Sequence, residues 1–317
     1  MSGAVFMFPG QSSRYPEMIE KVTDAHPAAA AVVRRASELL GRDLDRHYRA
    51  ENLEIFARNR DVQVGVFLAN HLHLTLLEEA GLRAEASLGA SLGEYNHLVH
   101  IGALAFDDAL VLVDQRGCLY DEVEGGAMVA VYPVEAGVAE RAIEALGLAG
   151  RVAIGLYNGP KQQVLSGERA AVAAVVAHLE ADDYIHAKEI EPRIPMHAPV
   201  FAPTAAKLRA VLLQTPFAVP RLPYVPNVLG SVVDAPGADA IRACLERHVH
   251  EPVRWQSSVE ALAARAPSAC FIEVGPRSIL HDLFGRGWAP CRRARTDAAE
   301  PWSEHVHTLT AKVADAA

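Results

Sequence analysis

The sequence predicts an α/β fold, with a core built on a parallel sheet and a smaller inserted subdomain, and three observations lead to this prediction. Residues 4–8 form an apolar run that ends at Pro9-Gly10, which is typical of a buried strand leading into a loop. Residues 86–95 have the order strand, tight turn and helix. Residues 125–192 follow the order βαββαβ, which is that of a ferredoxin-like unit.

Further helices and strands are expected on both sides of this subdomain. In the core we expect helices at 27–40, 62–80 and 106–121, and strands at 224–228 and 270–274. In the subdomain we expect strands at 128–132, 152–157, 163–166 and 184–190, and helices at 134–146 and 169–179. Because 317 residues exceed the usual size of one domain, we place the core at 1–124 and 193–317 and the insertion at 125–192.

Composition and charge exclude several classes of protein. Half of the residues are hydrophobic, 22% are charged and the net charge is −9, so the chain lacks the basic field of a nucleic-acid binder. Its apolar stretches are shorter than the ~20 residues of a membrane span, and no signal peptide precedes the first strand. No C-x-x-C spacing is found among Cys118, Cys244, Cys270 and Cys291. We therefore expect a cytoplasmic protein, with neither nucleic acid nor membrane as partner.

The run Gly89-Ala90-Ser91-Leu92-Gly93 places a hydroxyl where a nucleophile would lie. It matches the pattern Gly-x-Ser-x-Gly, in which a serine stands on a strained turn between a strand and a helix. Ser91 would then lie at a helix N-terminus, where free N–H groups favour a developing oxyanion. This geometry is typical of acyl transfer, although the motif alone also arises by chance.

Fourteen histidines are scattered along the chain, and one of them differs in its position. Three close pairs have no Cys, Asp or Glu near them at ligand spacing, so we expect no metal site. These pairs are His71/His73, His248/His250 and His305/His307. His197 follows Pro195 at the junction between insertion and core, where a cleft wall is expected.

The arginines raise two further questions. Arg116 stands within an apolar helical segment, where it either needs a partner or lies at the exposed edge of the helix. A late basic cluster is either a solvated surface run or a docking patch for an acidic protein or phosphate groups. This cluster consists of Arg286, Arg292, Arg293 and Arg295.

Short motifs occur in a fixed order along nearly the whole chain. They are Phe8-Pro9-Gly10-Gln11, Gly89-Ala90-Ser91-Leu92-Gly93-Glu94, Gln115-Arg116-Gly117, Gly126-Ala127-Met128, Asn158-Gly159-Pro160, Ser166-Gly167, Asn227-Val228, Pro252-Val253-Arg254-Trp255 and Glu273-Val274-Gly275-Pro276. This series resembles the malonyl-CoA:acyl-carrier-protein acyltransferase family. The resemblance implies an α/β-hydrolase-like core with an inserted ferredoxin-like subdomain. It also implies no bound cofactor, with CoA and the phosphopantetheine of a carrier protein as co-substrates.

The resemblance implies a role for each matching residue. Ser91 would be the acylated nucleophile and His197 its general base. The backbone N–H groups of Gln11 and Leu92 would form the oxyanion hole. Arg116 would clamp the free carboxylate of a malonyl group through a bidentate pair.

The chain departs from the family pattern near the expected acyl pocket. Ala90 replaces the usual His beside the nucleophile, Met196 precedes the base, and Tyr120-Asp121 stands where Met-Gln is common. Ser12-Ser13-Arg14 replaces Gly-Ser-Gln. We expect Ala90, Met196 and Tyr120 to bind substrate, and the departures favour a stand-alone enzyme of a polyketide-type pathway. His248 replaces a Gln whose backbone carbonyl orients the base, a role that any side chain allows.

We therefore expect a ping-pong acyltransferase that moves a malonyl-type group from a CoA thioester, through a serine acyl-enzyme, to an acyl carrier protein. Three alternatives stay open. They are transfer of a larger acyl group between carrier proteins, hydrolysis of acyl carrier proteins, and a non-catalytic subunit that docks a carrier protein through the late arginines. A conventional α/β-hydrolase would instead rely on a late histidine, His281 or His305.

Overall fold

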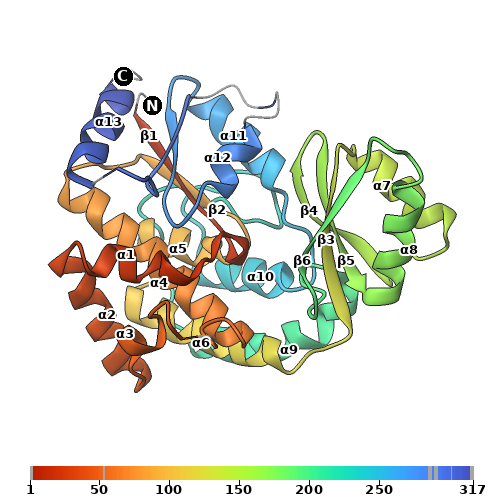
Figure 1. Ribbon diagram of the computed structural model, residues 1–317, viewed down its shortest axis with the longest axis horizontal. Helices are drawn as coiled ribbons and strands as arrows, with labels where there is room; N and C mark the ends of the chain where they lie inside the picture. The colour runs from red at the N-terminus through yellow and green to blue at the C-terminus, as the bar shows by residue number, and fades with distance from the viewer. Residues whose placement is uncertain (1–2, 53, 285–287, 289–291, 301, 315–317) are drawn as a thin grey trace.

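The computed structural model describes residues 3–52, 54–284, 288, 292–300 and 302–314. Within these ranges the chain forms two four-stranded sheets with helices packed around them (Figure 1).

The first sheet is parallel throughout and has the order β2-β1-β7-β8. Its strands are β1 (Ala4–Phe8), β2 (Ala86–Gly89), β7 (Cys270–Glu273) and β8 (Arg292–Arg295). Strand β1 is buried at every position, because its side chains pack alternately into two hydrophobic clusters, one on each face. Strands β1 and β2 end side by side, with Phe8 opposite Gly89, so their following loops meet at one edge of the sheet.

Helices surround this sheet, and the longest of them runs through the middle of the core. The helices before the second sheet are α1 (Glu20–Thr23), α2 (Pro27–Leu40), α3 (Leu44–His47), α4 (Asn59–Glu79), α5 (Gly93–His100) and α6 (Phe106–Asp121). Those after it are α9 (Ala202–Gln214), α10 (Ala238–His248), α11 (Trp255–Arg265), α12 (Ile279–Phe284) and α13 (Trp302–Ala314). Helix α4 is buried along most of its length and packs against α6, which brings the two segments that hold Arg116 together.

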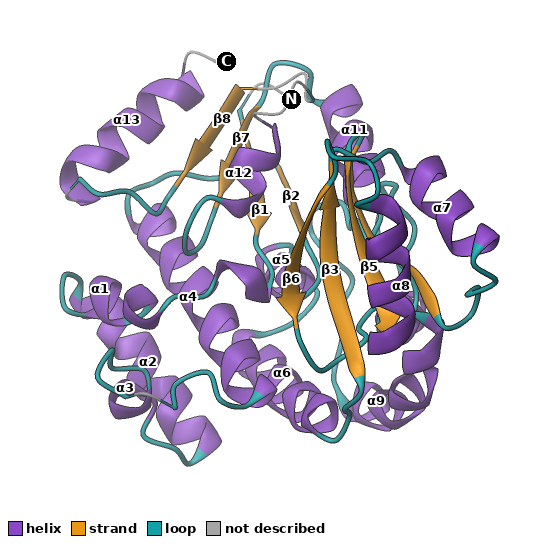
Figure 2. Cartoon of the chain, turned by 45° about the vertical axis from the view of Figure 1, so that its right-hand side comes forward, coloured by secondary structure: helices purple, strands orange, loops and turns teal. Residues whose placement is uncertain are grey.

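The second sheet is antiparallel and has the order β4-β5-β3-β6. Its strands are β3 (Gly126–Tyr132), β4 (Val152–Gly159), β5 (Gln162–Glu168) and β6 (His186–Glu191). Helices α7 (Ala136–Ala145) and α8 (Arg169–Leu179) cover one face (Figure 2). This is the predicted βαββαβ arrangement, so the predicted α/β fold with a parallel sheet and a ferredoxin-like unit is confirmed.

The two faces of strand β3 have different partners. Ala127, Val129 and Val131 pack under α7 and α8, whereas Met128 and Ala130 belong to the hydrophobic cluster of the core. The uncovered face of the small sheet therefore turns towards the core, and a cleft between the two sheets contains the candidate site.

One sequence prediction about the core was wrong. Residues 224–228 form no strand, because Pro226 has no N–H to donate and its carbonyl accepts from Gly230 in a turn. Only an isolated bridge joins Tyr224 to Val233 there. The segment Arg292–Arg295 forms strand β8, in which Ala294 is buried against the neighbouring elements while Arg292 and Arg295 stay exposed, so a surface run and a docking patch both stay open.

Candidate active site

Ser91 stands on a strained turn between β2 and α5. Its φ is 52°, in the left-handed region that side chains other than glycine rarely adopt. The glycines on either side are required by close packing. A Cβ on Gly89 would lie 2.0 Å from the Gly93 carbonyl oxygen, and a Cβ on Gly93 would lie 2.0 Å from the Phe8 carbonyl oxygen. The turn therefore holds Ser91 away from the sheet with its hydroxyl facing the cleft.

His197 lies within hydrogen-bonding distance of Ser91. Its Nε2 is 2.8 Å from Ser91 Oγ, and its Nδ1 is 2.7 Å from the backbone oxygen of His248. Because a carbonyl only accepts, we assign the proton to Nδ1, which leaves Nε2 as the acceptor for the serine hydroxyl. Burial, and then the charge of Arg116, lowers the pKa of His197 to about 3, so the ring is a neutral base at physiological pH.

The backbone N–H groups around Ser91 differ in whether they already have an acceptor. Ala90 donates to the Phe8 carbonyl at 2.9 Å, and the Ser91 N–H donates to Asn227 Oδ1 at 2.8 Å. Among the described residues, the N–H groups of Leu92 and Gln11 donate to no protein acceptor. These are the two groups assigned to the oxyanion hole from the sequence, and that role stays a prediction.

Arg116 is buried in the core and is not a surface residue at a helix edge. Its Nη1 donates to Gln63 Oε1 at 2.5 Å, and its guanidinium lies 4.2 Å from the centre of the Tyr120 ring and 5.3 Å from that of Tyr95. Its Nε and Nη2 have no hydrogen-bond acceptor among the described residues. A buried guanidinium with two free donors is costly unless an anion pairs with it.

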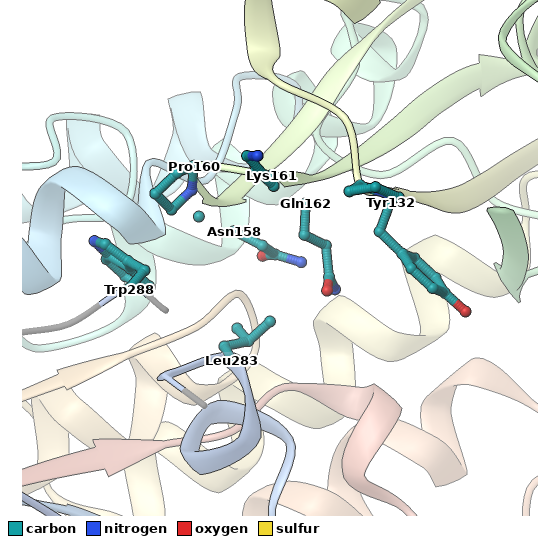
Figure 3. A pocket seen from close by; sticks show the side chains of 9 residues that line it. Tyr132, Asn158, Pro160, Lys161, Gln162, Leu283 and Trp288 are labelled. Atoms are coloured by element: carbon teal, nitrogen blue, oxygen red, sulfur yellow. The ribbon is translucent and has the colours of Figure 1, made fainter. Parts of the chain in front are cut away.

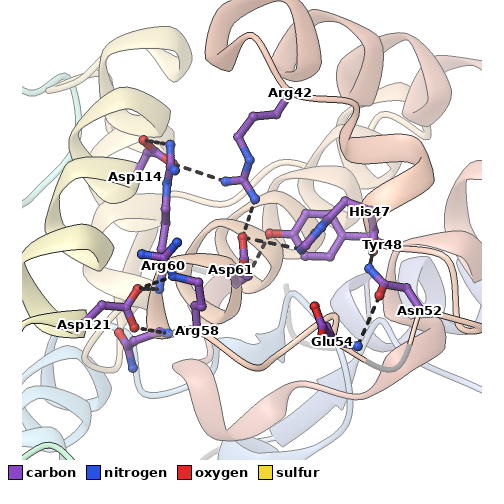
Figure 4. Close-up of polar contacts among 11 residues, drawn as sticks. Arg42, His47, Tyr48, Asn52, Glu54, Arg58, Arg60, Asp61, Asp114 and Asp121 are labelled. Carbon is purple, nitrogen blue, oxygen red and sulfur yellow. Dashed lines mark hydrogen bonds and ion pairs between the residues drawn. The ribbon is translucent and has the colours of Figure 1, made fainter. Parts of the chain in front are cut away.

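The first turn of α4 holds Gln63 against Arg116. Asp121, at the end of α6, accepts from the Asn59 N–H at 2.6 Å and the Arg60 N–H at 3.1 Å (Figure 4). Gln63 in turn donates from Nε2 to the Asn59 side-chain oxygen. Asp121 thus caps α4 and is not the partner of Arg116.

A network of ion pairs fixes the same end of α4 to its neighbours. Arg60 makes a bidentate pair with Asp114, with distances of 2.6 and 2.8 Å (Figure 4). Arg42, which follows α2, contacts both Asp61 and Asp114. The Tyr48 hydroxyl donates to the Asp61 backbone oxygen at 2.7 Å. These contacts anchor α4 to α2, α3 and α6.

A cavity of about 80 Å³ opens beside Ser91 and His197 and is lined by Gln11, Ala90 and Met196 among others. Arg116 and Tyr120 are not among its lining residues, and Tyr120 is completely buried beneath the guanidinium. Ala90 and Met196 therefore lie where the sequence placed them, whereas Tyr120 packs against the Arg116 guanidinium, and its expected role in binding substrate stays a prediction.

The cavity shares two lining residues, Asn158 and Leu283, with a larger hollow of about 360 Å³. In this hollow, Trp288 and Leu283 face the turn at Asn158 and Pro160 (Figure 3). A third hollow of about 510 Å³ adjoins both and is lined in part by Arg14, Lys188 and Arg277. The sequence missed this grouping because its members come from three distant segments.

Of the late arginines, the three that the structure describes do not line the cavity at Ser91. Arg292 and Arg295 are exposed on the edge strand β8, and Arg293 is half-buried. Arg286 lies outside the described residues. Their role in docking a carrier protein stays a prediction.

The two late histidines, His281 and His305, have partners away from the nucleophile. His281 pairs with Asp282, and His305 binds the Arg295 backbone oxygen and Glu300. In the part of the chain that the structure describes, no three or more His, Cys, Asp and Glu side chains are grouped to hold a metal ion. None of the described helices is both long and apolar enough to cross a bilayer.

Comparison with known proteins gives one consistent result. Residues 5–298 match the family described as acyl transferase domain. The chain is 32% identical over 290 residues to the malonyl CoA-acyl carrier protein transacylase of Escherichia coli (strain K12), covering 90% of this chain and 93% of that protein. Its fold is similar to that of the same transacylase from Clostridium perfringens, with a TM-score of 0.89, 26% identity and 98% of each chain covered. It is also similar to a malonyl-transacylase solved in complex with its type II PKS acyl-carrier protein, with a TM-score of 0.87, 28% identity and 99% of each chain covered.

Proposed function

The chain belongs to the acyl transferase domain family, and on this premise we propose that it moves a malonyl group from malonyl-CoA, through Ser91, to the thiol of an acyl carrier protein. The observation that carries this proposal is Arg116. Its buried guanidinium has two donors without an acceptor among the described residues, and its charge helps to lower the pKa of His197. The free carboxylate of malonyl is the group that would fill this position.

In the first half-reaction, His197 Nε2 takes the proton of the Ser91 hydroxyl while Oγ attacks the thioester carbonyl carbon. The oxygen of that carbonyl becomes an oxyanion, which the N–H groups of Gln11 and Leu92 stabilise. As the tetrahedral intermediate collapses, the carbon–sulfur bond breaks, and the CoA thiolate leaves with the proton held by His197. Arg116 holds the malonyl carboxylate throughout.

In the second half-reaction, the phosphopantetheine thiol of the carrier protein takes the place of CoA. His197 accepts the thiol proton, the sulfur attacks the ester carbonyl, and Ser91 leaves and recovers its proton. The two hollows that adjoin the cavity offer room for the long arm that both co-substrates share.

The proposal is tested by incubating the protein with malonyl-CoA and measuring its intact mass. We expect an adduct of one malonyl group that maps to Ser91 and is absent from Ser91→Ala. Acetyl-CoA and longer acyl donors serve as comparison. A protein that forms no adduct with malonyl-CoA but does so with a larger acyl donor would refute malonyl transfer, and one that forms none at all would refute acyl transfer through Ser91.

A further inference from the structure

Glu94 is a fully buried carboxylate one turn after the nucleophile, and the reaction described above does not use it. The Tyr224 hydroxyl donates to its Oε1, and the Asn227 N–H donates to its Oε2 at 3.3 Å. The Nδ1 of His248 lies 3.3 Å from the same Oε2. No arginine or lysine within the described ranges forms an ion pair with it. Burying a carboxylate without a paired cation costs free energy, so we expect the contacts of Glu94 to serve a function.

Through Asn227, Glu94 is connected to the turn that carries the nucleophile. The backbone N–H of Asn227 donates to Glu94. The side chain of Asn227 makes hydrogen bonds at both ends of the turn that carries Ser91. Its Oδ1 accepts from the Ser91 N–H at 2.8 Å, and its Nδ2 donates to the Gly89 carbonyl at 2.7 Å. Because the backbone of Ser91 is strained, these two hydrogen bonds hold the turn and thus the Ser91 hydroxyl in place.

Through His248, Glu94 is connected to the general base His197. His248 supplies the carbonyl that accepts the Nδ1 proton of His197, and the two imidazole rings stack with centroids 4.7 Å apart and planes inclined by 25°. Glu94 touches the His248 ring on Nδ1. One carboxylate therefore contacts the supports of both reacting residues.

We propose that Glu94 is a positioning residue for acyl transfer, which holds the Ser91 turn through Asn227 and the base-orienting carbonyl through His248. The inference rests on the proposed function only in taking Ser91 and His197 as the reacting pair. As His197 takes the serine proton it becomes an imidazolium, and an ionised carboxylate behind its carbonyl partner stabilises that charge without taking the proton.

This role has a consequence for the dependence on pH. Burial raises the pKa of Glu94 to about 7, against the opposing effect of the Tyr224 hydrogen bond, whereas the pKa of His197 is about 3. A neutral carboxyl below pH 7 gives no charge stabilisation, so the reactivity of Ser91 rises with pH as Glu94 ionises. Four other titratable groups face Glu94 and stay neutral in this range, because burial raises the pKa values of Tyr95, Tyr224 and Cys244 and lowers that of His248. The cation that acts on Glu94 is Arg116.

The test measures how fast phenylmethanesulfonyl fluoride modifies Ser91 between about pH 5.5 and about pH 8.5. In this reaction Oγ forms a bond to sulfur, fluoride leaves and His197 takes the proton, so the result does not depend on which acyl group the enzyme transfers. Wild-type protein is expected to show a rise centred near pH 7. Glu94→Gln, which keeps the shape but cannot ionise, is expected to react at least tenfold more slowly at the upper pH, without that rise.

A second variant moves the same pKa without touching either reacting residue. The Tyr224 hydroxyl donates to Glu94 and thereby lowers the pKa of Glu94. Tyr224→Phe removes this hydroxyl, so the rise in the reactivity of Ser91 should shift to higher pH. Should Tyr224→Phe leave the rise where it is in wild type, Glu94 is not the group that titrates and the proposal fails.

Glu273 provides a matched control. It is equally buried, its pKa is also raised to about 7 by burial, and it accepts from the N–H groups of Leu280 and His281 at the start of α12. Glu273→Gln should therefore retain the rise near pH 7. Loss of the rise in both Gln variants, or its retention in Glu94→Gln, would overturn the proposal. Failure of malonyl-CoA to acylate wild-type protein would count against the proposed substrate alone.

Discussion

The residues that do chemistry here are held by partners far away in sequence. Ser91 is clasped by Asn227, 136 residues later, and Arg116 is held by Gln63, 53 residues earlier. The Gly-x-Ser-x-Gly pattern identified Ser91 and the position after Pro195 singled out His197, whereas the roles of His197 and Arg116 came from the resemblance to the acyltransferase family. Asn227 belongs to the motif series behind that resemblance but received no role, and Gln63 carries no motif, because an amide side chain shows no role until the fold brings it to its partner.

Replacing the clamp should change which donor is used. We expect Arg116→Ala to slow acylation by malonyl-CoA at least tenfold, about 1.4 kcal/mol in the barrier, because the free carboxylate loses two charge-assisted hydrogen bonds. Acylation by acetyl-CoA should be equal or faster, since acetyl has no carboxylate. The measurement is the single-turnover rate with each donor. An unchanged malonyl rate would show that the guanidinium does not bind the substrate.

At the scale of helices and strands, the sequence predicted the elements that carry a local pattern. The expected ranges for β1, α2, α6 and α8 agree with the structure, because each has an apolar repeat that ends at clear stop signals. Strand β8 escaped prediction because four residues with three arginines have no strand pattern, and only pairing with β7 makes them a strand. The position of Asp121 beside the start of α4 likewise depends on how α4 and α6 pack.

The cap on α4 should affect both stability and donor choice. Asp121→Ala removes the acceptor for two N–H groups at the first turn, so we expect a loss of about 1 kcal/mol in the free energy of unfolding. Because the same turn holds Gln63, the ratio of malonyl to acetyl acylation should fall. Urea unfolding and donor competition measure the two effects.

Asp43→Ala is the matched control, since Asp43 caps the short helix α3 by accepting from the Arg46 N–H at 3.0 Å. It should cost similar stability and leave the donor ratio unchanged. Equal donor ratios in the Asp121 and Asp43 variants would show that the first turn of α4 does not position Gln63 for the Arg116 site.

At the scale of the whole molecule, several histidines are buried as neutral rings. Burial lowers the pKa values of His71, His73 and His100 to about 4 and that of His97 to about 3. Burial also lowers the pKa values of His197 and His248. Glu94 and Glu273 are shifted in the opposite direction, to about 7. The histidines outnumber these two carboxyl groups, so their proton uptake decides how stability responds to acid.

Stability should therefore fall as the solution becomes acidic. Below about pH 6.5 the unfolded chain binds protons on these histidines while the folded chain does not, so the free energy of unfolding decreases towards pH 4. Urea unfolding at a series of pH values measures the slope. His73→Leu removes one such ring, both of whose nitrogens lack hydrogen-bond partners in the described part of the chain, so the slope should become shallower. An identical slope in wild type and variant would contradict this explanation.

Transfer of an acyl group from Ser91 to a carrier-protein thiol can be followed in the isolated malonyl-enzyme. Malonyl-enzyme freed of CoA is mixed either with phosphopantetheinylated carrier protein or with buffer, and the intact masses of both proteins are followed in time. We expect the adduct to move to the carrier protein and to persist in buffer, because water does not replace the thiol. Loss of the adduct at the same rate in both mixtures, with free malonate as product, would contradict this transfer.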